Sequence, residues 1–225
     1  MKVAVIGTGM VGQAMAGRLD ELGHDVTVGT RDVAVSLART DPSGDGAFGD
    51  WAAAHPDVRV ATFAAAAVDA ELVVNATSGQ VSLEALHAVG AGTLAGSVLM
   101  DLSNPLDFSQ GFPPSLFVKD TDSLGEQIQA AFPDARVVKT LNTLTAELMV
   151  RPGQLPEGHT VFVGGNDPAA KELVTDVLRS MGHADVIDLG DITSSRGAEM
   201  FLPLWLRVMQ SLGTGMFNVK VVRET

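Results

Sequence analysis

Three glycines near the start of the chain have the spacing G-x-G-x-x-G and directly follow a short apolar stretch at residues 3–6. In this motif the first glycine permits a tight turn, the second lets backbone N–H groups approach a pyrophosphate, and the third lets the following helix pack closely on the strand. The N-terminus of that helix adds partial positive charge and free N–H donors. The stretch therefore predicts a dinucleotide site, with a purely structural glycine-rich turn as the alternative. The predicted binding residues are Gly7, Thr8, Gly9, Met10, Val11 and Gly12.

The residues that follow the second apolar strand distinguish NADP from NAD. A site that prefers NAD usually places Asp or Glu there, about 20 residues beyond the glycines, to bond the ribose 2′-hydroxyl. Thr30 and Arg31 stand at this place instead. A hydroxyl donor and a guanidinium suit a 2′-phosphate, and we expect the neighbouring Asp32 to cap the next helix. These residues favour NADP, with an ordinary solvated charge at Arg31 as the alternative.

Two short polar loops follow the next strands of the predicted sheet. Ligands of such sheets lie across the carboxyl ends of the strands, where these loops begin. Small polar residues there suit a nicotinamide that lies flat and is held by amide contacts, although each residue taken singly is also an ordinary turn-former. We predict that the loops contact the nicotinamide through Ala76, Thr77, Ser78, Asn104 and Pro105.

No residue pattern supplies a convincing proton donor or nucleophile. The five histidines are scattered without metal-ligand spacing, cysteine is absent, and no Ser/His/Asp arrangement is evident. Lys139 and Asn142, at the end of a predicted strand, are candidates for the substrate cleft. Lys139 is either a general acid or, as we favour, a lysine paired with a carboxylate. We therefore predict no catalytic side chain and no metal, which suits hydride transfer between two cofactors better than reduction of a simple ketone.

Apolar strands alternate with amphipathic helices along most of the chain. This alternation predicts an α/β fold: a Rossmann-type, doubly wound, mainly parallel sheet with a small C-terminal α/β extension. We expect residues 1–142 to bind the nucleotide and residues 143–225 to form the extension, with the substrate cleft and the dimer contact, either separate from the first domain or continuous with it. Beyond the first strand, expected strands cover residues 25–29, 58–62, 71–75, 97–102, 136–141, 160–164 and 186–189. Helices are expected at 10–22, 32–39, 51–55, 63–69, 81–89, 124–132, 168–181 and 193–212, and loops at 41–50 and 103–114.

The expected helix at residues 193–212 is apolar on nearly all sides. Such a helix is buried either in a core or against another subunit, and in a chain of this size we favour a homodimer interface. The 27 acidic and 15 basic residues give a net charge of −12, which argues against binding to nucleic acid or anionic membranes. The sequence shows neither a signal peptide nor an apolar run of transmembrane length, so we expect a cytoplasmic protein.

Seven stretches along the chain together resemble the F420-dependent NADP reductase family, and the resemblance covers essentially the whole chain. The family is also similar to the reductase domain of membrane metalloreductases. The resemblance implies a homodimer, NADP on the glycine turn, and direct hydride exchange between nicotinamide C4 and the deazaflavin C5 of coenzyme F420. It places Thr8 on the family's phosphate-loop threonine, and Thr30 and Arg31 on its 2′-phosphate pair. The stretches are GTGMVG, VTVGTR, VVNATSG, DLSNPLDF, VVKTLNT, VFVGGNDPAAKELV and DLGDITSSRGAEMFLPLWLRVM.

Two positions depart from the family pattern. Val35 stands where members often carry a lysine four residues past the arginine, and Asn142 where they can carry a histidine in the deazaflavin cleft. The expected function is an NADP-dependent oxidoreductase that exchanges hydride with coenzyme F420, a small-molecule redox partner. The alternatives are an NADPH-dependent reductase of an imine, carbonyl, flavin or metal chelate, and a nucleotide-sensing module without catalysis.

Overall fold

A single eight-stranded sheet runs through the computed structural model, which describes residues 1–39 and 47–224. The strand order is β10-β9-β8-β5-β4-β1-β2-β3, and every neighbouring pair is parallel except β8 and β9, which are antiparallel. The doubly wound, mainly parallel sheet predicted from the sequence is confirmed. The strands are β1 (Lys2–Ile6), β2 (Asp25–Thr30), β3 (Arg59–Thr62), β4 (Leu72–Asn75), β5 (Val98–Asp101), β8 (Arg136–Thr140), β9 (Thr160–Gly165) and β10 (Asp185–Asp188).

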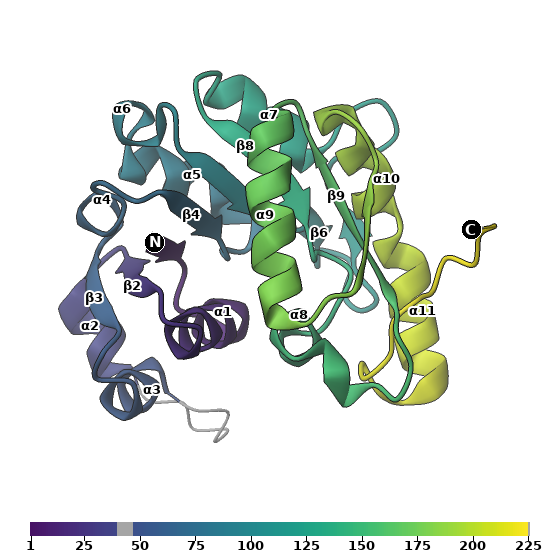
Figure 1. Cartoon of the computed structure of the whole chain (residues 1–225), viewed down its shortest axis with the longest axis horizontal. Coiled ribbons are helices and arrows are strands. Elements are labelled where there is room, and N and C mark those ends of the chain that lie inside the picture. Colours follow the sequence, from purple (N-terminus) through teal and green to yellow (C-terminus); the bar gives the residue numbers. More distant parts are fainter. Residues whose placement is uncertain (40–46, 225) are drawn as a thin grey trace.

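The central strands are buried on both faces, because successive side chains alternate between two hydrophobic clusters. Val3 and Val5 of β1 belong to one cluster, whereas Ala4 and Ile6 belong to the other. Figure 1 shows the sheet between its two helical layers, with the helices nearest the C-terminus at the β9 end of the molecule. The fold is therefore a three-layer α/β structure whose ligands are expected at the carboxyl ends of the strands.

The first cluster packs under helices α1, α3, α8 and α9, and the second under α4, α5, α6 and α7. A short antiparallel hairpin, β6 (Leu106–Asp107) with β7 (Ser115–Leu116), lies outside the sheet. No helix in the described ranges is long and apolar enough to cross a membrane. The helices are α1 (Met10–Glu21), α2 (Val33–Ala38), α3 (Phe48–Ala54), α4 (Phe63–Ala66), α5 (Gly79–Val89), α6 (Ala91–Leu94), α7 (Leu124–Ala131), α8 (Ala146–Val150), η1 (Pro152–Gln154), α9 (Pro168–Met181), η2 (Ile192–Ser194), α10 (Ser195–Met200) and α11 (Leu202–Leu212).

Polar residues cap three of the predicted helices where the sequence places their starts. The Asp32 carboxylate accepts a hydrogen bond from the Val35 N–H, and Asp167 does the same for Ala170 N–H. Ser123 accepts from the Glu126 N–H. Asp32 is therefore occupied at the start of α2, as predicted.

Three predictions of local structure are wrong. Helix α3 begins at Phe48, inside the predicted loop 41–50, of which residues 41–46 lie outside the described residues. The predicted loop 103–114 contains strand β6. The helix expected at 193–212 is three elements, η2, α10 and α11. Pro203 has no N–H to donate to the carbonyl of Glu199, and the helix is interrupted at Phe201 for that reason.

A buried histidine makes the stability of the fold sensitive to acid. His183 is 2% exposed, and its Nε2 lies 2.9 Å from the carbonyl oxygen of Met149. Burial lowers the pKa of His183, and the neighbouring His159 lowers it further, against the Met149 hydrogen bond, which raises it. In the unfolded chain this histidine takes up a proton near pH 6.5, whereas in the folded chain it takes up the proton only at lower pH. The contribution of His183 to stability is therefore complete above pH 6.5 and is lost as the pH falls below it.

We expect the free energy of unfolding to fall between pH 7 and pH 5, and to fall less steeply in His183→Gln. One proton corresponds to a slope of at most about 1.4 kcal/mol per pH unit. Urea denaturation of both proteins across this pH range measures the difference. Identical slopes would show that His183 takes up its proton as easily in the folded chain as in the unfolded one.

Candidate functional site

The three glycines of the motif occupy three different environments. Gly7 has φ +125°, and a Cβ there would lie 2.7 Å from the carbonyl oxygen of Ala76. A Cβ on Gly12 would lie 2.1 Å from the carbonyl oxygen of Gly7. Gly9, the N-cap of α1, would place its Cβ in open space. The turn and the close packing therefore require Gly7 and Gly12, whereas Gly9 leaves open the space that a ligand's phosphates need.

A pocket of about 440 Å³ opens at this turn, at the carboxyl ends of β1, β2 and β4. The strand order reverses beside β1, which is the place where doubly wound sheets bind nucleotides. Of the predicted residues, Gly7, Thr8, Gly9, Thr30, Arg31, Ala76, Thr77 and Ser78 line it. Met10, Val11 and Gly12 form the first turn of α1. The backbone N–H groups of these three residues have no partner within the helix. The lining also includes Gly29, Asp32, Val35, Ser36, Arg39, Phe63 and Val81.

The end of the pocket near β2 carries hydroxyl and guanidinium groups. The hydroxyls of Thr30 and Ser36 are 2.6 Å apart and buried. Arg31 pairs with Glu84 at 3.2 Å, and both side chains are largely exposed, so this pair contributes little stability and releases Arg31 easily. Donors of this kind fit a 2′-phosphate. Sequence reasoning missed Ser36, which lies one helical turn beyond the Asp32 cap, a spacing that points back toward β2.

The two polar loops meet each other at the next part of the sheet edge. A Cβ on Gly79 would lie 2.0 Å from the carbonyl oxygen of Asn104, so the backbones are in direct contact. Asn104 and Asn142 exchange two hydrogen bonds, since Asn104 Nδ2 donates to the Asn142 carbonyl at 2.8 Å and Asn142 Nδ2 donates to Asn104 Oδ1 at 3.0 Å. Asn142 also donates to the Ala198 carbonyl. Asn104, Pro105 and Asn142 therefore lie together but outside the lining of the 440 Å³ pocket.

Lys139 does not open into a cleft, which corrects its placement among the cleft residues. Its side chain is 1% exposed, and its Nζ lies 2.8 Å from Asp101 Oδ2 and 2.9 Å from Glu199 Oε1. It also donates to the Ser103 carbonyl at 2.5 Å. Burial alone would lower the pKa of Lys139, but the charges and hydrogen bonds of Asp101 and Glu199 outweigh it and raise the pKa above its ordinary value. Lys139 is thus paired with two carboxylates, as the favoured interpretation predicted.

The ion cluster Asp101–Lys139–Glu199 lies beneath both polar loops. Asp101 Oδ1 accepts hydrogen bonds from Asn75 Nδ2 at 2.8 Å and from Ser103 Oγ at 2.7 Å. Glu199 accepts from the backbone N–H groups of Leu124 and Gly125, at the start of α7. The cluster therefore ties the loops after β4 and β5 to α7 and α10. Sequence reasoning missed Asp101 and Glu199, because their pairing joins segments that are far apart in the chain.

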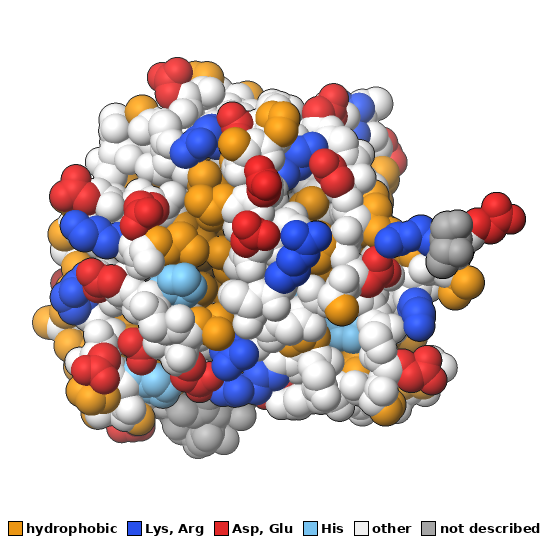
Figure 2. Space-filling model, in the orientation of Figure 1, with side chains coloured by type: hydrophobic (Ala, Val, Ile, Leu, Met, Phe, Trp, Pro, Cys, Tyr) orange, Lys and Arg blue, Asp and Glu red, His pale blue; other side chains and the backbone are white. Residues whose placement is uncertain are grey.

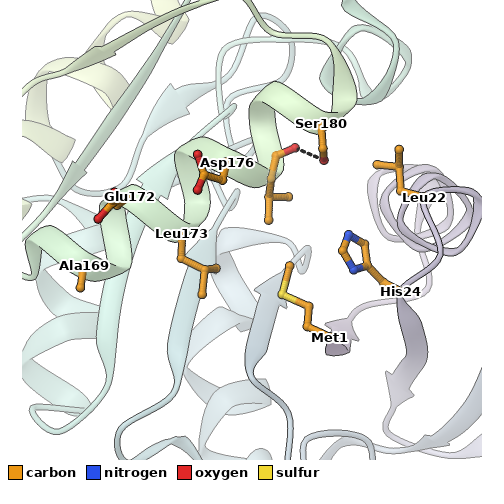
Figure 3. Close-up of a pocket in the computed structure, with 9 residues that line it drawn as sticks. Met1, Leu22, His24, Ala169, Glu172, Leu173, Asp176 and Ser180 are labelled. Atoms are coloured by element: carbon orange, nitrogen blue, oxygen red, sulfur yellow. Dashed lines mark hydrogen bonds between the residues drawn. The ribbon is translucent and has the colours of Figure 1, made fainter.

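A second hollow, of about 510 Å³, lies between the end of α1 and helix α9. Figure 3 shows Met1, Leu22 and Leu173 directed into it, and Figure 2 shows apolar side chains exposed along this groove. Met1 and His24 precede β1 and β2, so the hollow is at the amino ends of the strands. The length of β1 and of α1 separates it from the glycine turn at the opposite ends of the strands, and we do not include it in the site.

The sheet, the glycine turn at its switch point and the polar end of the pocket define a dinucleotide-binding fold of the Rossmann class. Residues 2–105 match the family model for NADP oxidoreductase, coenzyme F420-dependent. A crystal structure from Arthrobacter sp. FB24, named as a candidate F420-dependent NADP reductase, is 57% identical and superposes with a TM-score of 0.95, covering 99% of this chain and 100% of that one. The chain belongs to the coenzyme F420-dependent NADP oxidoreductase family, and it is an NADP-dependent oxidoreductase.

Two curated relatives are more distant. The metalloreductase STEAP3 of Rattus norvegicus is 28% identical over 220 residues, which are 96% of this chain and 40% of that protein. The F420-dependent NADP reductase of Methanocaldococcus jannaschii is 26% identical over 127 residues, 55% of this chain and 56% of that protein. The matched regions thus span about half or less of these two relatives.

Proposed function

We propose that the chain exchanges hydride between NADP(H) and coenzyme F420. The observation that carries this proposal is the 57% identity, over both whole chains, to a protein named for that reaction. Nicotinamide supplies a hydride at C4 and the deazaflavin accepts it at C5, with one proton from solvent completing the reduction. The site residues then bind and orient the two cofactors, and no side chain has to release a proton.

Each part of the pocket has a proposed role. The first-turn N–H groups of α1, at Met10, Val11 and Gly12, bind the pyrophosphate, and Thr30 with Arg31 bind the 2′-phosphate. The loop at residues 76–78 contacts the nicotinamide from the pocket side. Asn104 and Pro105 approach it from the β5 side, because the backbone contact between Asn104 and Gly79 joins the two loops. The paired Asn142 holds Asn104 in place at the acceptor side.

Residues 143–225 are proposed to complete the acceptor side and to form a homodimer through α11. Leu202, Trp205 and Leu206 of this helix are buried against its own chain, whereas Leu204 and Leu212 are each 57% exposed. Exposed leucines on a helix that ends the fold favour a second copy as their cover. Light scattering should then give twice the 23.4 kDa mass of the chain; a monomer would contradict this part.

We expect rapid loss of the visible absorbance of oxidised F420 when the protein is mixed with NADPH, and at least about tenfold slower loss with NADH. The same stopped-flow assay with a free flavin, a cyclic imine or a ferric chelate compares the other acceptors. The similarity to STEAP3 makes the ferric chelate the most informative of these. Turnover of one of these acceptors without turnover of F420, at any pH tested, would overturn the proposal.

A further inference from the structure

A second arginine lies across the mouth of the nucleotide pocket. Arg39, the C-cap residue of α2, donates from Nη2 to Thr8 Oγ1 at 2.7 Å and to the Thr8 carbonyl at 3.4 Å. These contacts join the end of α2 to the glycine turn, and both residues line the pocket. The Arg39 side chain is exposed, and its partner is a neutral hydroxyl. A guanidinium forms stronger hydrogen bonds with an anion than with a neutral hydroxyl. An anion bound beside Thr8 would therefore be a better partner for Arg39 than the Thr8 hydroxyl is.

Arg39 and Val35 are neighbours in the lining of the pocket. Val35 is the third residue of α2, and Arg39, four residues further on, is the C-cap residue of this helix, with extended backbone. Both line the pocket, and Val35 is 67% exposed without any charge to offer. The long side chain of Arg39 can therefore supply, from one turn further on, the charge that Val35 lacks.

The side chains around Arg39 suit an anion with several oxygen acceptors, such as a phosphate monoester. The lining offers the hydroxyls of Thr8, Thr30 and Ser36 together with the guanidinium of Arg31. The carboxylate in the lining, that of Asp32, accepts the Val35 N–H and caps α2. In a chain with a net charge of −12, a doubly charged ligand needs such local positive groups.

We infer that Arg39 is a ligand of the 2′-phosphate of NADP, and that it exchanges Thr8 for this phosphate when the nucleotide binds. The inference rests on the proposed use of this pocket for NADP. It adds Arg39 to Thr30 and Arg31 as a residue that determines the preference for NADP. It also gives a function to the contact between Arg39 and Thr8.

The test compares two nucleotides that differ only in the 2′-phosphate. Isothermal calorimetry should show NADP binding weakened about tenfold in Arg39→Gln, with NAD binding changed by less than about twofold. Arg39→Lys should recover part of the loss, because it restores the charge without the planar fork. Arg179→Gln is the matched control, since Arg179 is an exposed arginine on α9 and its loss changes the net charge equally.

Equal weakening of NADP and NAD would overturn the inference, because it would place Arg39 at the pyrophosphate. Unchanged affinity for both nucleotides would overturn it as well. The measurement needs no turnover of F420. A collapsed preference for NADP in Arg39→Gln therefore supports the inference even if F420 proves not to be the acceptor, and the two proposals can fail separately.

Discussion

Replacing Lys139 with Met should lower the free energy of unfolding by about 3–5 kcal/mol. The substitution removes the one positive charge between Asp101 and Glu199, whose side chains are 0% and 1% exposed. Two carboxylates would then remain buried without their shared partner, and this penalty is larger than the lost hydrogen bonds themselves. Urea denaturation, followed by tryptophan fluorescence and by circular dichroism, measures the loss as a lower midpoint at an unchanged slope.

Arg179→Met is the control for this experiment. Arg179 pairs with Asp176 at 3.5 Å, and both side chains are about two-thirds exposed. An exposed pair of this kind contributes at most about 0.5–1 kcal/mol. A loss below about 1 kcal/mol in Lys139→Met as well would contradict the assignment of Lys139 as the shared ion-pair partner of the two buried carboxyl groups.

The ion cluster also explains why the loops of the site hold their shape. Asp101 directs the amide of Asn75, and Asn75 Oδ1 in turn accepts from the hydroxyl of Thr77 at 2.7 Å. The hydroxyl of Thr77, a residue of the pocket lining, is thus fixed through two buried side chains. The stability of the cluster and the geometry of the pocket lining at residues 76–78 are therefore coupled, and weakening one should loosen the other.

Local chemistry made much of this fold predictable from the sequence. Asp32 and Asp167 mark helix starts because a short carboxylate satisfies N–H groups that the helix leaves free, a rule that needs no knowledge of the rest of the chain. The glycine motif was predictable for a similar reason, since the positive φ of Gly7 and the close contact of Gly12 with the carbonyl oxygen of Gly7 both arise within residues 7–12. The break before α11 was not predicted, because the helix expected at 193–212 rested on its apolar residues alone and left Pro203 within it out of account.

The pairing of distant side chains was not predictable. Nothing near Lys139 in the sequence indicates Glu199, which reaches it only because α10 packs over the carboxyl end of β8. Arg39 is a similar case, because its reach to Thr8 depends on where α2 ends relative to the glycine turn. Side-chain direction and the packing of separate segments decide such contacts, and a single sequence records neither.

One added methyl group should separate the structural glycine from the ligand-binding glycine of the motif. In Gly12→Ala the new Cβ would lie 2.1 Å from the carbonyl oxygen of Gly7, a backbone atom that cannot move aside as the end of a flexible side chain could. We expect a loss of about 1–3 kcal/mol in the free energy of unfolding. In Gly9→Ala the Cβ meets no atom within 4 Å, and the backbone at φ −78° suits alanine. Stability should therefore change by less than about 1 kcal/mol.

Nucleotide binding should respond in the opposite order. Gly9 lines the pocket, and the Cβ of Gly9→Ala would occupy open space beside the place proposed for the pyrophosphate. The same overpacking, about 1–3 kcal/mol, then arises only in the complex, so the affinity for NADP should fall roughly tenfold to a hundredfold. The affinity for NAD should fall by the same factor, because the pyrophosphate is common to both nucleotides. This equal loss distinguishes the role of Gly9 from that of Arg39, whose replacement should weaken NADP binding alone. Urea denaturation and calorimetry on the two variants supply both measurements. If Gly9→Ala bound both nucleotides as tightly as the parent chain, the pyrophosphate could not lie against this turn, and the proposed orientation of NADP across the sheet would be wrong.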